Sequence, residues 1–367
     1  SWFKKNKYLA KVLFMKQILV IQNKRIGDVL ISSVLANNLK KRFPESTITY
    51  LVYPFTAGVL ENNPNIDHIW RVDEKWLKKL PNLLKIINRV RKEQFDIIFD
   101  PYAKLQSRLI CYFSGAEYRI GFKRPGKKLK LPFYSHPVHF LQNKTKNCGK
   151  AIENRLNLLD AVFPMEAMDD TPKIFLTKEE ENYTKISDLK KPVIMLGVLG
   201  STPQKSMPYE YIATLIDYIA KNYNASLLFN YAPYQKSEAE AIYNLCEHKE
   251  HIHLDIYEDS IRGFITLMNK CDMLISNEGG SVHIAKALNK PTFTVYSPYI
   301  NKDDWNSFEE GTKHQSIHLR DYKPGLYKSY TREERKAIEA NPLKLYQELT
   351  PEMILTVLKP YLQHHIP

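Results

Sequence analysis

The chain has 367 residues, 44% of them hydrophobic and 12% aromatic, which excludes a disordered polypeptide and favours two α/β domains over a single core. Four scattered cysteines, without a CxxC pair, argue against a disulfide framework and a zinc site. The net charge of +13 resides in residues 1–150, with 29 Lys and Arg against 10 Asp and Glu; residues 151–367 have 24 against 30. The first part is therefore expected to meet nucleic acid, an anionic membrane surface or a phosphorylated substrate, or to be a basic surface without a partner.

The first residues of the chain are both basic and apolar. Residues 1–14 place four lysines among aromatic and aliphatic side chains, a composition typical of a short amphipathic helix at a membrane interface. A solvated extension and a helix packed on the protein itself are the alternatives. No apolar run approaches the roughly 20 residues needed to span a bilayer, and no signal peptide is recognisable. We expect a cytoplasmic protein, soluble or peripheral on the inner face of the cytoplasmic membrane.

Short apolar runs alternate with helix-like stretches along the first half of the chain. The apolar runs predict strands at residues 16–22, 47–52, 95–100 and 118–122. The stretches between them predict helices that include residues 29–43 and 78–93. This alternation indicates βαβ units on a parallel sheet.

The same pattern starts again in the second half. Strands are expected at residues 192–200, 225–232, 272–278 and 291–297, and helices at 208–221, 282–288 and 350–363. A polar stretch at 163–191 separates the two patterns and puts the domain boundary near residue 175. The predicted fold is α/β, with Rossmann-like doubly wound domains at 1–175 and 176–367 facing a central ligand cleft. Residues 299–349 are polar and receive no assignment.

The turn after the first expected strand carries the candidate catalytic residue. The strand runs into Asn23–Asp28, and a helix is expected directly afterwards. Gly27 allows backbone amides to approach a ligand, and Asp28 stands at the carboxyl end of the strand. The alternative is that Asp28 only stabilises the helix N-terminus through the helix dipole. A GxGxxG dinucleotide fingerprint is absent from this turn.

Two turns of the second domain have the composition of a diphosphate site. Ser201, Thr202 and Lys205 follow one expected strand and precede a helix. Residues 277–283 follow another strand, and their paired glycines expose the unpaired amides of a helix start, which attract anions. His283 stands one turn into that helix. Each signal is weak by itself, but all three turns are expected to point into one cleft.

At these residues the sequence resembles glycosyltransferase family 9, the lipopolysaccharide heptosyltransferases. Residues 18–52 resemble the family's opening strand, its Gly-Asp-Val turn and the following helix and strand. Residues 274–298 resemble its Asp-Thr-Gly-x-x-His segment, QKSMP resembles its Lys-x-Trp-Pro, and GAEYRIGF its Gly-Ala-x-x-Arg-Ile-Gly-Phe. Similar blocks occur in the same order from about residue 16 to 298.

The resemblance implies an inverting, metal-independent enzyme of the GT-B type, with no cofactor because the nucleotide sugar is a substrate. It implies that Asp28 is the general base that takes the proton of the acceptor hydroxyl. The remaining implied donor contacts stabilise the leaving diphosphate, and these are Ser201, Thr202, Lys205, Glu278, Gly279, Gly280, Ser281 and His283. The expected donor is ADP-heptose, and the expected acceptor is a lipopolysaccharide core or a related phosphorylated glycolipid.

Two departures from the family pattern bear on the substrates. Glu278 and Gly279 stand where the family usually has Asp and Thr, so one hydroxyl contact is missing and a carboxylate reaches farther. Residues 100–109 replace the family's Asp-x-Gln-Gly-x-x-Lys-Ser, with Gln106 at the position of the acceptor-contacting Lys. Lys104 and Arg108 are candidate substitutes for that Lys, and Arg25 is a further candidate acceptor contact.

Three other functions remain open at this stage. One is a glycosyltransferase that uses a UDP- or GDP-sugar to make another surface polysaccharide. The second is a nucleic-acid-binding protein, suggested by the basic half of the chain, although no RNA- or DNA-binding signature is present and no nucleic acid is expected. The third is a sensor that binds nucleotide sugars without catalysis, suggested by the altered pair at Glu278 and Gly279.

Overall fold

The computed structural model describes residues 16–123, 131–202, 205–325, 330–341 and 343–366. The chain divides into two compact units, Ser1–Phe175 (unit 1) and Leu176–Pro367 (unit 2). The expected amphipathic helix at residues 1–14 lies outside the described residues.

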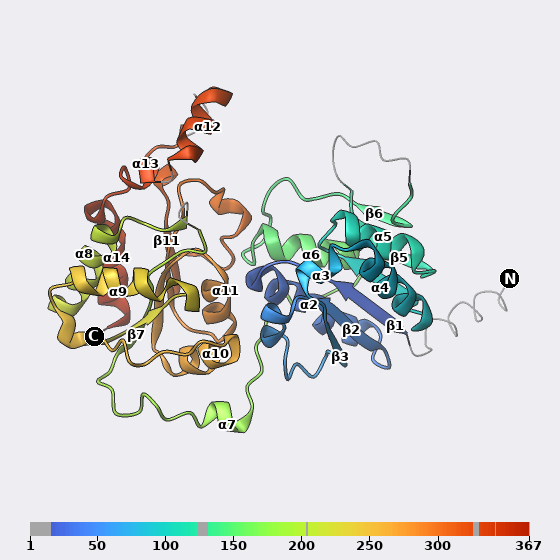
Figure 1. Ribbon diagram of the computed structural model, residues 1–367, viewed down its shortest axis with the longest axis horizontal. Helices are drawn as coiled ribbons and strands as arrows, with labels where there is room; N and C mark the ends of the chain where they lie inside the picture. The colour runs from blue at the N-terminus through green and yellow to red at the C-terminus, as the bar shows by residue number, and fades with distance from the viewer. Residues whose placement is uncertain (1–15, 124–130, 203–204, 326–329, 342, 367) are drawn as a thin grey trace. The chain divides into compact units, whose positions relative to one another are not determined.

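Unit 1 contains a six-stranded parallel sheet with the order β3-β2-β1-β4-β5-β6 (Figure 1). Its strands are β1 (Gln17–Ile21), β2 (Thr47–Val52), β3 (His68–Arg71), β4 (Ile97–Asp100), β5 (Tyr118–Phe122) and β6 (His136–Val138). Its helices are α2 (Ile26–Arg42), α3 (Glu74–Leu77), α4 (Leu80–Lys92), α5 (Leu105–Phe113) and α6 (Lys150–Asp160), with a 3-10 turn η1 (Pro54–Val59).

Helices cover the sheet of unit 1 because its strands are apolar on both faces. Leu19 and Ile21 of β1 pack with α4 and α5 in one core cluster. Ile18 and Val20 alternate with them and point to the opposite face, and both are fully buried. Helices α2 and α6 pack against each other, as do α4 and α5.

Unit 2 contains a five-stranded parallel sheet with the order β11-β10-β9-β7-β8 (Figure 1). Its strands are β7 (Val193–Gly197), β8 (Ser226–Asn230), β9 (Met273–Asn277), β10 (Thr292–Val295) and β11 (His314–Ile317). Its helices are α7 (Lys178–Glu181), α8 (Tyr209–Asn222), α9 (Lys236–Leu245), α10 (Ile261–Lys270), α11 (Gly280–Ala287), α12 (Arg332–Ala340), α13 (Leu343–Tyr346) and α14 (Pro351–His365). Short 3-10 turns are η3 (Pro233–Gln235), η4 (Lys249–His251), η5 (Lys302–Asp304) and η6 (Leu319–Asp321).

The predicted pair of parallel α/β sheets is confirmed, and each of the eight expected strands overlaps a strand of the structure. Strands β3, β6 and β11 were not predicted. The capped terminal helix is also confirmed, because the Thr350 side chain accepts a hydrogen bond from the Met353 amide at the start of α14. The first helix begins at Ile26, earlier than the predicted residue 29, so Asp28 lies inside its first turn.

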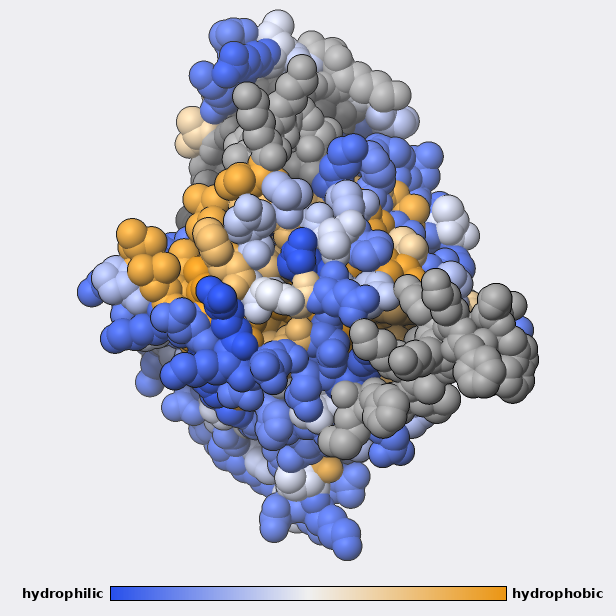
Figure 2. Space-filling view, turned by 90° about the vertical axis from the view of Figure 1, so that its right-hand side faces the viewer, coloured by the Kyte–Doolittle hydropathy of each residue, from blue (hydrophilic) through white to orange (hydrophobic). Residues whose placement is uncertain are grey.

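The surface of unit 1 carries exposed apolar side chains among charged ones. Figure 2 shows a face on which apolar side chains gather beside strongly hydrophilic ones. Within the described residues, no helix is both long enough and apolar enough to cross a membrane.

Candidate active site

Asp28 is buried at the start of α2, just beyond the carboxyl end of β1. Its Oδ1 atom lies 2.8 Å from Lys24 Nζ and 3.0 Å from Arg155 Nη2. Both of these contacts are made to Oδ1. The Gln22 side chain also donates a hydrogen bond to the Asp28 carbonyl, at 3.1 Å, which fixes the helix start. One carboxylate oxygen is thus held by two cations.

Arg155 is a member of this site that sequence reasoning missed. It lies on α6, is 7% exposed, and also donates to the Ala151 carbonyl at 3.1 Å. Burial lowers the pKa of its guanidinium, and the Asp28 carboxylate opposes that shift. The surrounding sequence, ENRLNLL, does not indicate that Arg155 contacts Asp28, because the contact depends on how α6 packs on α2.

Asn23 is a second unexpected feature of the turn. It is 1% exposed, and neither its amide nitrogen nor its carbonyl oxygen has a hydrogen-bond partner among the described residues. A buried amide without partners costs free energy, so we expect a ligand or a water molecule to bind there. The turn from β1 to α2 therefore holds both a fixed carboxylate and unused polar groups.

The predicted acceptor residues lie in different surroundings. Arg25 is the N-cap residue of α2 and is exposed, and Lys104 is exposed at the start of α5. Gln106 is half-buried. Arg108 is buried, with its guanidinium 5.9 Å from the Phe133 ring and 6.0 Å from the Tyr134 ring. Arg25 and Lys104 are thus the ones most open to a ligand, whereas Arg108 packs among aromatic rings.

The carboxyl end of β4 is fixed by a fully buried carboxyl group. Asp100 accepts hydrogen bonds from the Tyr134 hydroxyl at 2.7 Å and from the Ala103 amide at 2.8 Å. Burial raises the pKa of Asp100 to about 6, although the Tyr134 hydrogen bond works in the opposite direction. The Tyr134 ring lies over Gly121, where a Cβ atom would come within 2.3 Å of it. These contacts anchor residues near 134 on the same edge of the sheet as Asp28.

In unit 2 the turn after β7 is held in shape by buried polar side chains. The Ser206 hydroxyl accepts from the Gly200 amide at 2.9 Å and donates to the Thr202 carbonyl at 3.2 Å. A Cβ atom at Gly200 would come within 2.2 Å of the Lys205 carbonyl, so the turn requires glycine. The predicted donor residues Ser201 and Thr202 are exposed on this turn.

Lys205 and Glu278 come together from two different turns. Lys205 Nζ lies 3.2 Å from Glu278 Oε1, and Glu278 Oε2 accepts from the Ser297 amide at 3.0 Å. Burial raises the pKa of Glu278, against the opposing charge of Lys205. The longer carboxylate noted in the sequence therefore contacts the lysine expected to bind phosphate.

The turn after β9 begins α11 with an open backbone. Gly280 is the first residue of that helix, and a Cβ atom at Gly279 would meet no other atom within 4 Å. The Ser281 hydroxyl lies 3.4 Å from that of Ser276. The His283 ring is 6.2 Å from the Trp305 ring. Exposed amides at a helix start are suited to a phosphate group.

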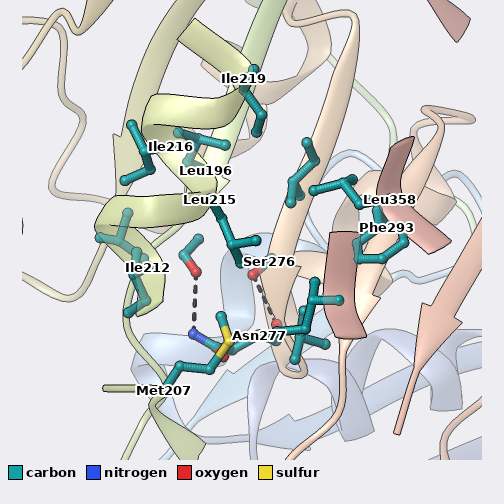
Figure 3. A pocket seen from close by; sticks show the side chains of 15 residues that line it. Leu196, Met207, Ile212, Leu215, Ile216, Ile219, Ser276, Asn277, Phe293 and Leu358 are labelled. Atoms are coloured by element: carbon teal, nitrogen blue, oxygen red, sulfur yellow. Dashed lines mark hydrogen bonds between the residues drawn. The ribbon is translucent and has the colours of Figure 1, made fainter. Parts of the chain in front are cut away.

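A small apolar cavity lies beneath these two turns (Figure 3). Its volume is about 30 Å³, and α8 lines much of it through Ile212, Leu215, Ile216 and Ile219. A cavity of this size holds no more than a water molecule, and its apolar lining offers a water few partners. It is a packing defect under the turns and is too small for a nucleotide.

Close packing between β7 and β9 fixes the positions of the two turns that follow these strands. A Cβ atom at Gly197 would come within 1.9 Å of Ser276 Oγ, and Asn277 Nδ2 donates to the Gly197 carbonyl at 3.3 Å (Figure 3). We expect Gly197→Ala to lower the free energy of unfolding by about 1–3 kcal/mol through overpacking. Urea denaturation measures this loss. Gly325→Ala is the matched control, since nothing lies within 4 Å of its added Cβ; equal midpoints for the two variants would contradict the prediction.

The structure thus gathers the candidate residues into two sets, one in each unit. Asp28, Lys24 and Arg155 form the set in unit 1, and Lys205, Glu278 and the start of α11 form the set in unit 2. Both sets lie at the carboxyl ends of parallel strands, where open α/β sheets bind ligands. Two Rossmann-like units with an acidic residue at the strand ends of one and a helix start suited to phosphate in the other are the arrangement expected of a GT-B glycosyltransferase.

A family model described as glycosyltransferase family 9 (heptosyltransferase) matches residues 83–322. The chain belongs to this family and is a glycosyltransferase. It is 23% identical over 293 residues to lipopolysaccharide heptosyltransferase 1 of Campylobacter coli, which covers 76% of this chain and 83% of the relative. It is 21% identical over 362 residues to lipooligosaccharide heptosyltransferase 2 of Haemophilus ducreyi, covering 91% and 98% of the two chains.

Solved structures share the fold. A family 9 glycosyltransferase from Veillonella parvula superimposes with a TM-score of 0.75 at 18% identity, covering 95% of this chain and 97% of the other. The E. coli heptosyltransferase WaaC with ADP gives a TM-score of 0.67 at 12% identity, covering 94% and 99%. The resemblance to family 9 and the GT-B fold expected from the sequence are therefore confirmed.

Proposed function

We propose that this glycosyltransferase moves a heptose from ADP-heptose, with inversion and without a metal ion, to the phosphorylated core of a lipopolysaccharide or a related glycolipid. The observation that carries the proposal is Asp28, whose Oδ1 atom is held by Lys24 and Arg155 at the carboxyl end of β1, and we assign Oδ2 to the substrate. The names of the relatives support the sugar and the acceptor, and the structure of WaaC with ADP supports the nucleotide.

In this proposal Asp28 Oδ2 accepts the proton of the acceptor hydroxyl as its oxygen attacks the anomeric carbon of the donor. The bond between that carbon and the diphosphate breaks, and the nucleoside diphosphate leaves. Lys205 and the amides at the start of α11 stabilise the charge that develops on the diphosphate. Ser201, Thr202 and His283 are assigned to positioning it. The described residues contain no group of three His, Cys, Asp or Glu side chains arranged to hold a metal ion.

The basic first half of the chain supports an anionic acceptor. Arg25 and Lys104 are exposed on the unit that carries Asp28, and we propose them as contacts for acceptor phosphates. Gln106 and Arg108 are also proposed as acceptor residues. Arg108 would act indirectly, by holding the Phe122 carbonyl and the Phe133 ring in place. The same proposal includes peripheral binding of the protein to the anionic inner face of the cytoplasmic membrane.

A different nucleotide-sugar donor is the second candidate, and the Glu278–Lys205 pair favours it. A buried carboxylate 3.2 Å from the phosphate-binding lysine changes the charge that the donor meets. The experiment must therefore measure which nucleotide and which sugar the protein binds, separately from whether it transfers a sugar.

Thermal unfolding with ADP, UDP, GDP and their sugar conjugates tests the donor side. We expect ADP to stabilise the wild-type protein by about 2.7 kcal/mol at 100-fold excess over its dissociation constant, and the shift to be lost in Lys205→Ala. Lys205→Ala also leaves Glu278 buried without its cation, so the shift on adding nucleotide is compared, not the absolute midpoint.

Lys236→Ala is the matched control, because Lys236 is an exposed lysine of unit 2 outside both turns. It should keep the full ADP shift. A selective shift with UDP or GDP would replace the proposed donor by the second candidate. Mass spectrometry of the acceptor after incubation with the stabilising sugar nucleotide then measures transfer; no shift with any nucleotide would contradict the proposal.

A further inference from the structure

Four large apolar side chains are exposed where α3, α4 and α5 begin. Trp76 is 38% exposed, Leu80 65%, Leu84 50% and Leu105 60%. Single exposed apolar residues are ordinary on protein surfaces, so the informative property is their grouping. We call these four residues the apolar edge of unit 1.

The topology brings these residues together. Helices α3 and α4 follow β3, and α5 follows β4, so Leu80 and Leu105 are the first residues of two helices that pack side by side. Leu84 lies one turn after Leu80 on the same face of α4.

The apolar edge lies at the same end of the sheet as Asp28. The strands of unit 1 are parallel, so β1, β3 and β4 all end at that edge, and the helices that follow them start there. Asp28 is in the first turn of α2 after β1, and Leu105 is the first residue of α5 after β4, the neighbouring strand. A surface bound at the apolar edge would therefore lie at the same end of the sheet as the proposed acceptor site.

The charge around the apolar edge is strongly positive. Residues 73–92 contain seven Lys and Arg against two acidic residues. Lys75, Lys78 and Lys79 alternate with Trp76 and Leu80 in the chain, and only Lys78 has a described acidic partner, Glu74 at 2.8 Å. Protein interfaces are depleted in lysine, whereas apolar side chains surrounded by lysines are typical of surfaces that bind anionic lipid.

We propose that the apolar edge docks on an anionic lipid bilayer, with Trp76, Leu80, Leu84 and Leu105 entering the interface and Lys75, Lys78 and Lys79 meeting lipid phosphates. The role of this docking rests on the proposed function, because a protein bound to the bilayer would bring Asp28 close to a lipid-linked acceptor. It does not depend on residues 1–14.

Sedimentation with lipid vesicles tests this proposal on the full chain. We expect the wild type to bind vesicles of phosphatidylethanolamine with phosphatidylglycerol, and to bind phosphatidylcholine vesicles much more weakly. The variant Leu80→Ser/Leu84→Ser/Leu105→Ser should lose about tenfold or more in apparent affinity, because three side chains no longer bury apolar surface in the bilayer. The variant Lys75→Gln/Lys79→Gln should weaken binding to anionic vesicles only.

Two single variants serve as matched controls. Phe113→Ser removes an exposed apolar residue at the opposite end of α5, and Leu245→Ser removes one from unit 2; both residues are 47% exposed. Both should bind vesicles as the wild type does. Equal vesicle binding by the triple variant and the wild type would overturn the proposal, as would a triple variant that binds normally but loses self-association in light scattering, which would make the apolar edge a protein interface.

Sugar transfer to a water-soluble, delipidated acceptor separates this inference from the proposed function. The triple variant should keep wild-type turnover on that acceptor and lose turnover on the lipid-linked one. If the wild type transfers no sugar to either acceptor, the proposed function fails, while the vesicle measurement still decides whether the apolar edge binds lipid.

Discussion

Replacing Asp28 with Asn is expected to lower kcat by about 10²–10⁴-fold, the usual contribution of a positioned general base. The amide keeps the shape of the carboxylate but cannot accept the proton of the acceptor hydroxyl. Donor binding should be unchanged, because Lys205 and the start of α11 belong to unit 2. Steady-state kinetics and the thermal shift with ADP, measured on the same preparation, give the two quantities.

The matched control for this variant is Glu210→Gln. Glu210 is an acidic residue in the first turn of α8, as Asp28 is in α2, but it is exposed. Its effect shows what is lost when an acidic residue in a first helical turn only stabilises the helix through the helix dipole, which contributes about 0.3–1 kcal/mol. If Asp28→Asn retains turnover, Asp28 is not the base and its carboxylate has a structural role with Arg155.

The parallel sheets were predictable from the sequence because their inner strands are buried on both faces. Such strands appear as continuous apolar runs, as in β1 and β9, where every residue but Gln17 is buried. The three strands that were missed, β3, β6 and β11, each lie at the edge of a sheet. These three strands have only three or four residues, and β3 and β6 are partly exposed, so HIWR, HPV and HQSI lack the apolar run that signals a strand.

The candidate site was predictable in part for a related reason. Asp28, Lys205 and the Gly279–His283 turn each follow a strand with a clear signal, so their positions at the carboxyl edges followed from the strands. Contacts between distant segments could not be predicted. Glu278 meets Lys205 only because β7 and β9 are neighbours in the sheet, an order that the apolar pattern does not encode.

The contact between Asp28 and Arg155 is the strongest example, since 127 positions separate the two residues. A buried arginine without a counter-charge is costly, and so is a buried carboxylate. The pair therefore ties the orientation of the Asp28 side chain to the packing of α6 on α2. Lys24 contacts the same oxygen from solvent, with 41% of its side chain exposed, and constrains the carboxylate less.

Arg155→Met should accordingly affect both stability and rate. Loss of one partner of a buried ion pair is expected to lower the free energy of unfolding by about 3–5 kcal/mol, which urea denaturation measures. Release of the Asp28 carboxylate from its fixed geometry should lower kcat by about 10²-fold per folded molecule, without raising the KM for the donor. Arg155→Lys keeps the charge but loses the planar fork, so its kcat should lie between those of Arg155→Met and the wild type. A purely structural role for Arg155 predicts a different result, in which the folded fraction falls but each folded molecule turns over at the wild-type rate. The two roles therefore separate once kcat is normalised to the concentration of folded protein.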